Sequence, residues 1–123
     1  MSFVRRHHIS FKNAFNGIFW AFSTQPNFRV HITLSISALA LGFVLKVSYI
    51  EMTILALTIA FGLGIEMVNT SIEAMTDLIT QEYQKNAKVA KDVSAGMMLL
   101  VAAFTVVVAA LIFVPRIITI ISF

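Results

Sequence analysis

Cysteine is absent from the 123 residues, which excludes a disulfide framework and a thiolate metal site. Charged residues are also scarce at 12%, whereas a soluble domain of this size carries about a quarter. Hydrophobic residues make up 59% of the chain. Lipid is therefore expected to replace water over much of the surface. The Lys and Arg residues are scattered and no base-stacking module accompanies them, so the expected partners are membrane lipids and not nucleic acid.

Three apolar segments, at 30–45, 52–65 and 94–114, are candidates for membrane spans. A spanning helix needs about 20 mostly apolar residues. The third segment meets this length alone, and the first does so with the residues after it. The second qualifies only if it includes the polar residues that follow. The sequence predicts a single all-α membrane domain over 1–123, with spans at about 29–48, 50–78 and 93–115.

The stretch before the first span, "FKNAFNGIFWAF", has apolar residues at helical spacing: Phe11, Phe15, Ile18 and Phe22. Trp20 is placed to anchor such a helix at the headgroups. We expect an amphipathic helix over about 10–24 that lies in the membrane interface. The alternative interpretation is a helix that only anchors the chain.

The positive charges predict the orientation. With three spans, most Lys and Arg residues fall on the side of the N-terminus: Arg5, Arg6, Lys12, Arg29, Lys85, Lys88 and Lys91. The other side holds Lys46 and Arg116. The positive-inside rule then places the N-terminus and the 78–93 loop in the cytoplasm, where nucleotides are available.

A polar stripe follows the second apolar segment, in "GIEMVNTSIEAMTDLIT". Its members, Glu66, Asn69, Thr70, Glu73 and Asp77, share one helical face. Glu66 is predicted just inside the membrane edge, where an unpaired carboxylate is expensive. Carboxylates and an amide beside the cytoplasm offer the oxygen ligands that Mg²⁺ and its phosphates require.

The following loop, "TQEYQKNAKVAKDVSAG", supplies positive charge. Lys88, Lys91 and Asp92 are spaced to share a helical face next to the third span. Lysine can neutralise a polyphosphate without a Walker glycine loop, which this sequence lacks. Such a loop also serves in many membrane proteins as the topogenic signal alone.

The run "EMVNTSIEAMTDLIT" with "KDVSAG" behind it, after "NFRVH" and within three spans, resembles the prokaryotic diacylglycerol kinase and undecaprenol kinase family. The resemblance covers nearly the whole chain. It implies a homotrimeric lipid kinase of the prokaryotic cytoplasmic (inner) membrane, which phosphorylates diacylglycerol or undecaprenol with ATP and Mg²⁺.

The resemblance also implies roles for the motif residues. Glu66 is similar to the general base that accepts the proton of the lipid hydroxyl. Asn69 is expected to position the phosphate and metal cluster, and Glu73 to be a magnesium ligand that also contacts the nucleotide. Lys91 resembles the phosphate-binding lysine, with Asp92 as its acidic neighbour on the nucleotide.

Outside the central motif, Glu82 and Arg6 match nucleotide contacts of the family, and Arg29 matches a basic residue that positions substrate. Gln25 stands where the diacylglycerol kinases have a second metal-ligand glutamate. Its amide oxygen can still ligate Mg²⁺ and contact the nucleotide, but it brings no charge. We expect a weaker metal site than in the acidic form.

Two other classes of function fit part of the pattern. In a small homo-oligomeric transporter or proton-relay channel, Glu66 would be a protonatable group inside the bundle. In a purely structural subunit, Glu66 and Asn69 would hold neighbouring helices together. Neither class explains why the polar stripe continues to Asp77 and is followed by Lys91 and Asp92.

Overall fold

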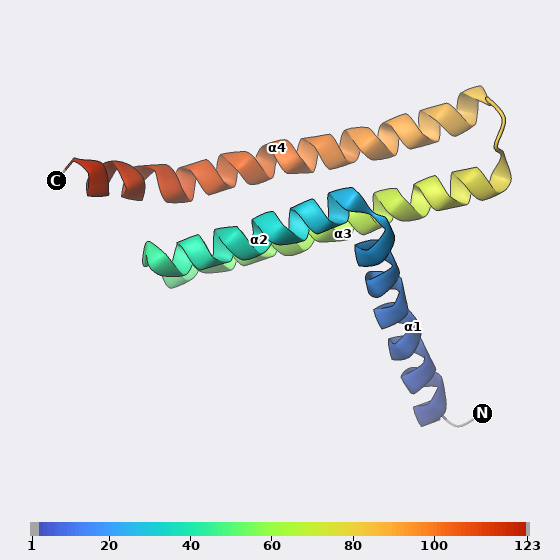
Figure 1. Ribbon diagram of the computed structural model, residues 1–123, viewed down its shortest axis with the longest axis horizontal. Helices are drawn as coiled ribbons and strands as arrows, with labels where there is room; N and C mark the ends of the chain where they lie inside the picture. Colours follow the sequence, from blue (N-terminus) through green and yellow to red (C-terminus); the bar gives the residue numbers. More distant parts are fainter. Residues whose placement is uncertain (1–2, 123) are drawn as a thin grey trace.

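The computed structural model describes residues 3–122, with side chains from residue 7 onward. The expected all-α fold is confirmed: the elements of this part are α1 (Phe3–Thr24), α2 (Pro26–Val44), α3 (Tyr49–Ile79) and α4 (Lys85–Ile121). Helices α2, α3 and α4 run side by side, whereas α1 leaves them at a steep angle (Figure 1). The most extensive packing is between α3 and α4.

Helices α2, α3 and α4 are each long and apolar enough to cross a membrane. Their mutual contacts bury only a small core, centred on Leu55, Ile112 and Phe113. Large apolar side chains such as Leu57 and Phe104 remain about two thirds exposed along the same helices. A surface of this kind is stable in lipid, where apolar side chains need no burial against protein.

Helix α1 begins at Phe3, before the start at residue 10 that the sequence pattern predicts. Phe11 and Phe15 on its apolar stripe are 66% and 69% exposed, which leaves that stripe available to a membrane surface. The helix ends at a corner where Pro26 opens α2 in the first turn, a position that tolerates proline because no amide donor is needed there. Phe28, just past the corner, is buried.

Helices α2 and α3 approach closely at Gly42, where an added Cβ would lie 2.9 Å from the Cε of Met52. Beyond it, Lys46 has a φ of 51°, in the left-handed region. Its amide donates to the carbonyl of Phe43, and the amide of Val47 donates to that of Gly42. This pattern closes the C-terminal end of α2.

Hydrogen bonds of Ser48 and Glu51 stabilise the connection between α2 and α3. The amide of Ser48 donates to Glu51 Oε2 at 2.8 Å, and the amide of Glu51 donates to Ser48 Oγ at 3.3 Å, which forms a capping box. Arg116 of α4 reaches the same carboxylate and donates from Nη1 to Glu51 Oε1 at 2.8 Å and from Nη2 to Oε2. Ser48, Glu51 and Arg116 therefore all have hydrogen-bond partners at this end.

Candidate functional site

The polar stripe of α3 begins at buried positions and ends at an exposed one. Glu66 and Thr70 of the stripe are 4% and 8% exposed, and Thr76, which lies beside the stripe, is 8% exposed. The hydroxyl of Thr76 donates to the carbonyl of Ile72 at 2.7 Å, so its polarity is satisfied within its own helix. Glu66 and Thr70 thus face the protein interior, as expected for polar groups at membrane depth, whereas Asp77 at the end of the stripe is exposed.

Asn69 connects α3 to α4. Its Nδ2 donates to Glu73 Oε1 at 3.1 Å, one turn further along α3. Its Oδ1 accepts a hydrogen bond from the hydroxyl of Ser94, which is 2% exposed. Because both ends of the amide are engaged, Asn69 is held in one orientation and fixes one oxygen of Glu73. The second oxygen of Glu73 and the second N–H of Asn69 have no bond within the described residues.

Two ion pairs follow at the same end of the bundle. Lys91 of α4 pairs with Asp77 of α3, and both side chains are partly exposed. Lys88 pairs with Asp92 one turn along α4. The two lysines that share a helical face therefore have separate partners. A polyphosphate that reached this end would compete with Asp77 for the ammonium group of Lys91.

Glu66 differs from the other acids of the stripe. Among the side chains that the structure describes, its carboxylate forms no hydrogen bond or ion pair. No fully enclosed side-chain oxygen in this part of the chain lacks a partner, so the Glu66 oxygens border a surface that a hydroxyl could reach. A nearly buried carboxylate without a partner is costly, which makes Glu66 a candidate functional group of a membrane-spanning helix.

The remaining predicted site residues are not part of this hydrogen-bond network within the described residues. Gln25 is the N-cap residue of α2, and its Nε2 donates to Thr24 Oγ1 at 3.2 Å, which leaves its Oε1 unengaged. Arg29 is exposed in the first turns of α2, and Glu82 is exposed between α3 and α4. Within residues 7–122, no hydrogen bond or ion pair joins these three side chains to the stripe. The side chain of Arg6 lies outside the described residues.

The acidic groups fit a magnesium–nucleotide complex better than a metal cage. Within the described residues, no three His, Cys, Asp or Glu side chains converge. Glu66 and Glu73 are two helical turns apart, a rise of about 10 Å, so one ion could not bridge them without distortion. Mg²⁺ typically takes only one or two protein carboxylates and completes its shell with phosphates and water. The free oxygen of Glu73 fits that requirement.

Sequence reasoning missed Ser94 and the pairing of Asp77 with Lys91. Both contacts cross from α3 to α4, as does the bond between Glu51 and Arg116. In each of these pairs, the midpoint of the two residue numbers falls between 81 and 84, in the short connection between the two helices. The signal was therefore present: two antiparallel helices with a short connection place residues equally distant from it side by side.

The fold and the site first define the class of protein: it is a helical membrane protein with an organised polar site at one end of its helix bundle. The model of the prokaryotic diacylglycerol kinase family matches residues 12–113. The chain belongs to this family, whose members are membrane lipid kinases.

Individual relatives agree with the family match. The chain is 36% identical to a diacylglycerol kinase of Synechocystis over 108 residues, which are 87% of this chain and 62% of that relative. It is 35% identical to the undecaprenol kinase of Bacillus subtilis over 113 residues, 92% of each chain. It is 28% identical to a diacylglycerol kinase of Helicobacter pylori over 97 residues, 73% of this chain and 76% of that one. The chain thus spans less than two thirds of the cyanobacterial relative's length. These similarities give no support to a transporter or channel.

Proposed function

We propose that this protein transfers the γ-phosphoryl group of ATP to the hydroxyl of a membrane lipid alcohol, diacylglycerol or undecaprenol. The observation that carries the proposal is Glu66, which is nearly buried and unpaired beside the fixed Asn69–Glu73 pair. The family membership supports the same reaction class.

Glu66 acts as the general base. It accepts the proton of the lipid hydroxyl as the oxygen attacks the γ-phosphorus, and the bond from that phosphorus to the bridging oxygen of ADP breaks. The product is a lipid phosphate, and ADP leaves with the negative charge of the bridging oxygen. A base without a hydrogen-bond partner is ready to accept this proton without first losing another contact.

The ends of α3 and α4 supply the charge that phosphoryl transfer needs. When the nucleotide binds, the ammonium group of Lys91 leaves Asp77 and pairs with the phosphates. It neutralises their charge as a point charge. Asn69 presents its second N–H to the transferred group. We assign Asp92 and Glu82 to contacts with the nucleotide.

Residues near the start of the chain complete the proposed site. Arg6 contributes a further nucleotide contact, and Arg29 positions the substrate. The exposure of Arg29 leaves its guanidinium available for this role.

Mg²⁺ would be held by Glu73, with the free amide oxygen of Gln25 as a weaker, uncharged ligand. When bound, the ion neutralises charge on the β- and γ-phosphates. The contribution of the protein is orientation: the hydrogen bonds from Ser94 to Asn69 and from Asn69 to Glu73 hold the carboxylate before nucleotide binds.

We further propose a homotrimer in the prokaryotic inner membrane with its N-terminus in the cytoplasm. The distribution of Lys and Arg supports the orientation. Single cysteines introduced at Lys85 and at Ser48 should react with impermeant thiol reagents from the cytoplasmic and external sides respectively. Labelling of both from one side would contradict the three-span arrangement.

The direct test is phosphate transfer by the purified protein. Radiolabelled ATP with Mg²⁺ is supplied together with 1,2-dioleoylglycerol or undecaprenol in mixed micelles, and labelled lipid is extracted. We expect labelled lipid phosphate in proportion to the enzyme added. No transfer to either alcohol, in protein that is folded and binds ATP, would contradict the proposal.

A further inference from the structure

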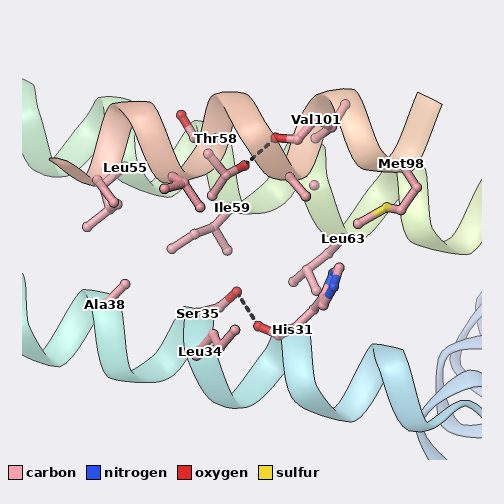
Figure 2. A pocket seen from close by; sticks show the side chains of 15 residues that line it. His31, Leu34, Ser35, Ala38, Leu55, Thr58, Ile59, Leu63, Met98 and Val101 are labelled. Carbon is pink, nitrogen blue, oxygen red and sulfur yellow. Dashed lines mark hydrogen bonds between the residues drawn. The ribbon is translucent and has the colours of Figure 1, made fainter. Parts of the chain in front are cut away.

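A pocket of about 320 Å³ lies between α2, α3 and α4 (Figure 2), and its lining on α3 ends at Leu63, three residues before Glu66 of the polar site. Its wall is formed largely by apolar residues, among them Leu55, Ile59, Leu63 and Met98. The volume is at the lower end of the range for small-molecule sites. All lining residues fall within the predicted spans, so the expected occupant comes from the lipid phase.

The hydroxyl groups of this pocket are turned away from an occupant. Ser35, Thr58 and Thr105 each donate to the carbonyl four residues earlier in their own helix, at 2.7–2.8 Å. A hydroxyl satisfied in this way presents mainly its carbon atoms to the pocket. The three hydroxyl side chains therefore add little polarity to the wall.

His31 is the exception. Its imidazole projects from α2 toward Leu63 of α3 (Figure 2), and it is half-buried. Within the described part of the chain the ring forms no hydrogen bond; only its backbone carbonyl is engaged, by Ser35. His31 thus provides the free hydrogen-bonding side chain of the pocket.

The position of His31 relates the pocket to the proposed reaction. Leu63, toward which the ring points, precedes Glu66 by three residues and shares its helical face. One turn of helix, a rise of about 5 Å, therefore separates the level of His31 from that of the proposed base. A lipid chain in the pocket would present its polar end to His31 and then to Glu66.

We propose that the pocket holds the hydrocarbon adjoining the hydroxyl of the lipid alcohol, and that His31 is a substrate-binding residue for that hydroxyl. This inference rests on the proposed kinase function. A wall with one free polar group matches an alcohol whose only polar atom at that end is the hydroxyl, as in a polyprenol. A diacylglycerol brings two ester groups close to its hydroxyl, and their carbonyls would be left unpaired in this pocket at a cost in affinity.

Filling the pocket tests its occupancy. Ala102 lines it, whereas the neighbouring Ala103 is exposed outside it, so Ala102→Leu and Ala103→Leu form a matched pair. Ala102→Leu should raise the KM for undecaprenol about tenfold, with the KM for ATP within about twofold of the wild type. Ala103→Leu should leave both unchanged. Ala38→Leu, with Ala40→Leu as its control, fills the same pocket from α2 and replaces the first pair if Ala102→Leu does not fold.

Substitution of His31 tests the polar contact. His31→Leu should lower kcat/KM for undecaprenol about tenfold, the value of one hydrogen bond, without changing the KM for ATP. His31→Gln, which keeps a donor and an acceptor, should recover most of that loss. Wild-type kcat/KM should be higher for undecaprenol than for 1,2-dioleoylglycerol.

Several results would overturn the inference while the proposed function stands. One is a wild type that is active but has a higher kcat/KM for dioleoylglycerol than for undecaprenol. Another is a KM for undecaprenol that is the same in the pocket-filling variants and in their controls. A change in oligomer size with unchanged lipid KM would instead assign the pocket to a second copy of the chain. If the wild type phosphorylates neither alcohol, the proposed function itself fails.

Discussion

The two ends of the α3–α4 pair use charge differently. At one end, the Glu51 carboxylate accepts hydrogen bonds from Ser48 and from Arg116. At the other, Asn69 and Glu73 are fixed by bonds, but Glu66 is nearly buried with no partner in the described residues. Burial of a polar group is stabilising only when its bonds are satisfied. We therefore propose that the Glu51–Arg116 end serves stability and that the unpaired Glu66 serves the chemistry.

The largest effect is expected at Glu66. Glu66→Gln keeps the shape of the side chain but cannot accept the proton of the lipid hydroxyl. Loss of a general base typically costs 10²- to 10⁴-fold in rate, so we expect kcat for lipid phosphorylation to fall by about that factor. ATP affinity, measured by equilibrium binding to the same protein, should change far less because Lys91 and Glu73 remain. Equal losses of ATP affinity and kcat would instead make Glu66 part of the nucleotide site.

A smaller effect is expected at the metal. Glu73→Gln should raise the Mg²⁺ concentration required for half-maximal activity by at least about tenfold, or abolish turnover. Gln25→Glu should lower that concentration because it adds a charged ligand. Glu51→Gln, a carboxylate change at the far end, is the control and should leave the Mg²⁺ dependence unchanged. A Mg²⁺ titration that is identical for Glu73→Gln and wild type would remove Glu73 from the metal site.

Substitutions at the Glu51–Arg116 end should change thermal stability and not turnover. Arg116→Leu leaves the half-buried Glu51 carboxylate without its main partner. We expect Tm in detergent micelles to fall by a few degrees, about 2–8 °C, with turnover within about twofold of the wild type. The double variant Glu51→Gln with Arg116→Leu should recover part of the loss. If single and double variants lose the same amount, packing of the arginine stem and not the ion pair stabilises this end.

The smallest effect concerns the backbone beside that end. Lys46 closes α2 with a φ of 51°, a conformation that glycine adopts at lower cost. Lys46→Gly should raise the free energy of unfolding by about 0.5–1 kcal/mol. Lys46→Ala removes the same charge but keeps the backbone strain, so its stability should stay near that of the wild type. A gain in both variants would attribute the effect to the charge.

Local periodicity predicted much of this fold. The apolar segments gave three spanning helices, and the spacing of Glu66, Asn69 and Glu73 gave one polar face, because these relations lie within single helices. Contacts between helices were not predictable in this way, since Ser94 meets Asn69 only through the packing of α4 on α3. Whether Glu66 has a partner also depends on the side chains of neighbouring helices, which the periodicity of one helix does not describe. Its roles as base, and those of Glu73 and Lys91 toward metal and phosphate, stay predictions.

The most direct measurement compares the two ends in one experiment. Lipid phosphorylation and Tm are determined together for Glu66→Gln and Glu51→Gln in the same lipid mixture. We predict that Glu66→Gln loses at least about a hundredfold in turnover with an unchanged or higher Tm, because it replaces a nearly buried, unpaired acid. Glu51→Gln should lower Tm and leave turnover within about twofold. Near-wild-type turnover in Glu66→Gln, or a Tm that falls together with its turnover, would contradict the assignment of Glu66 to catalysis.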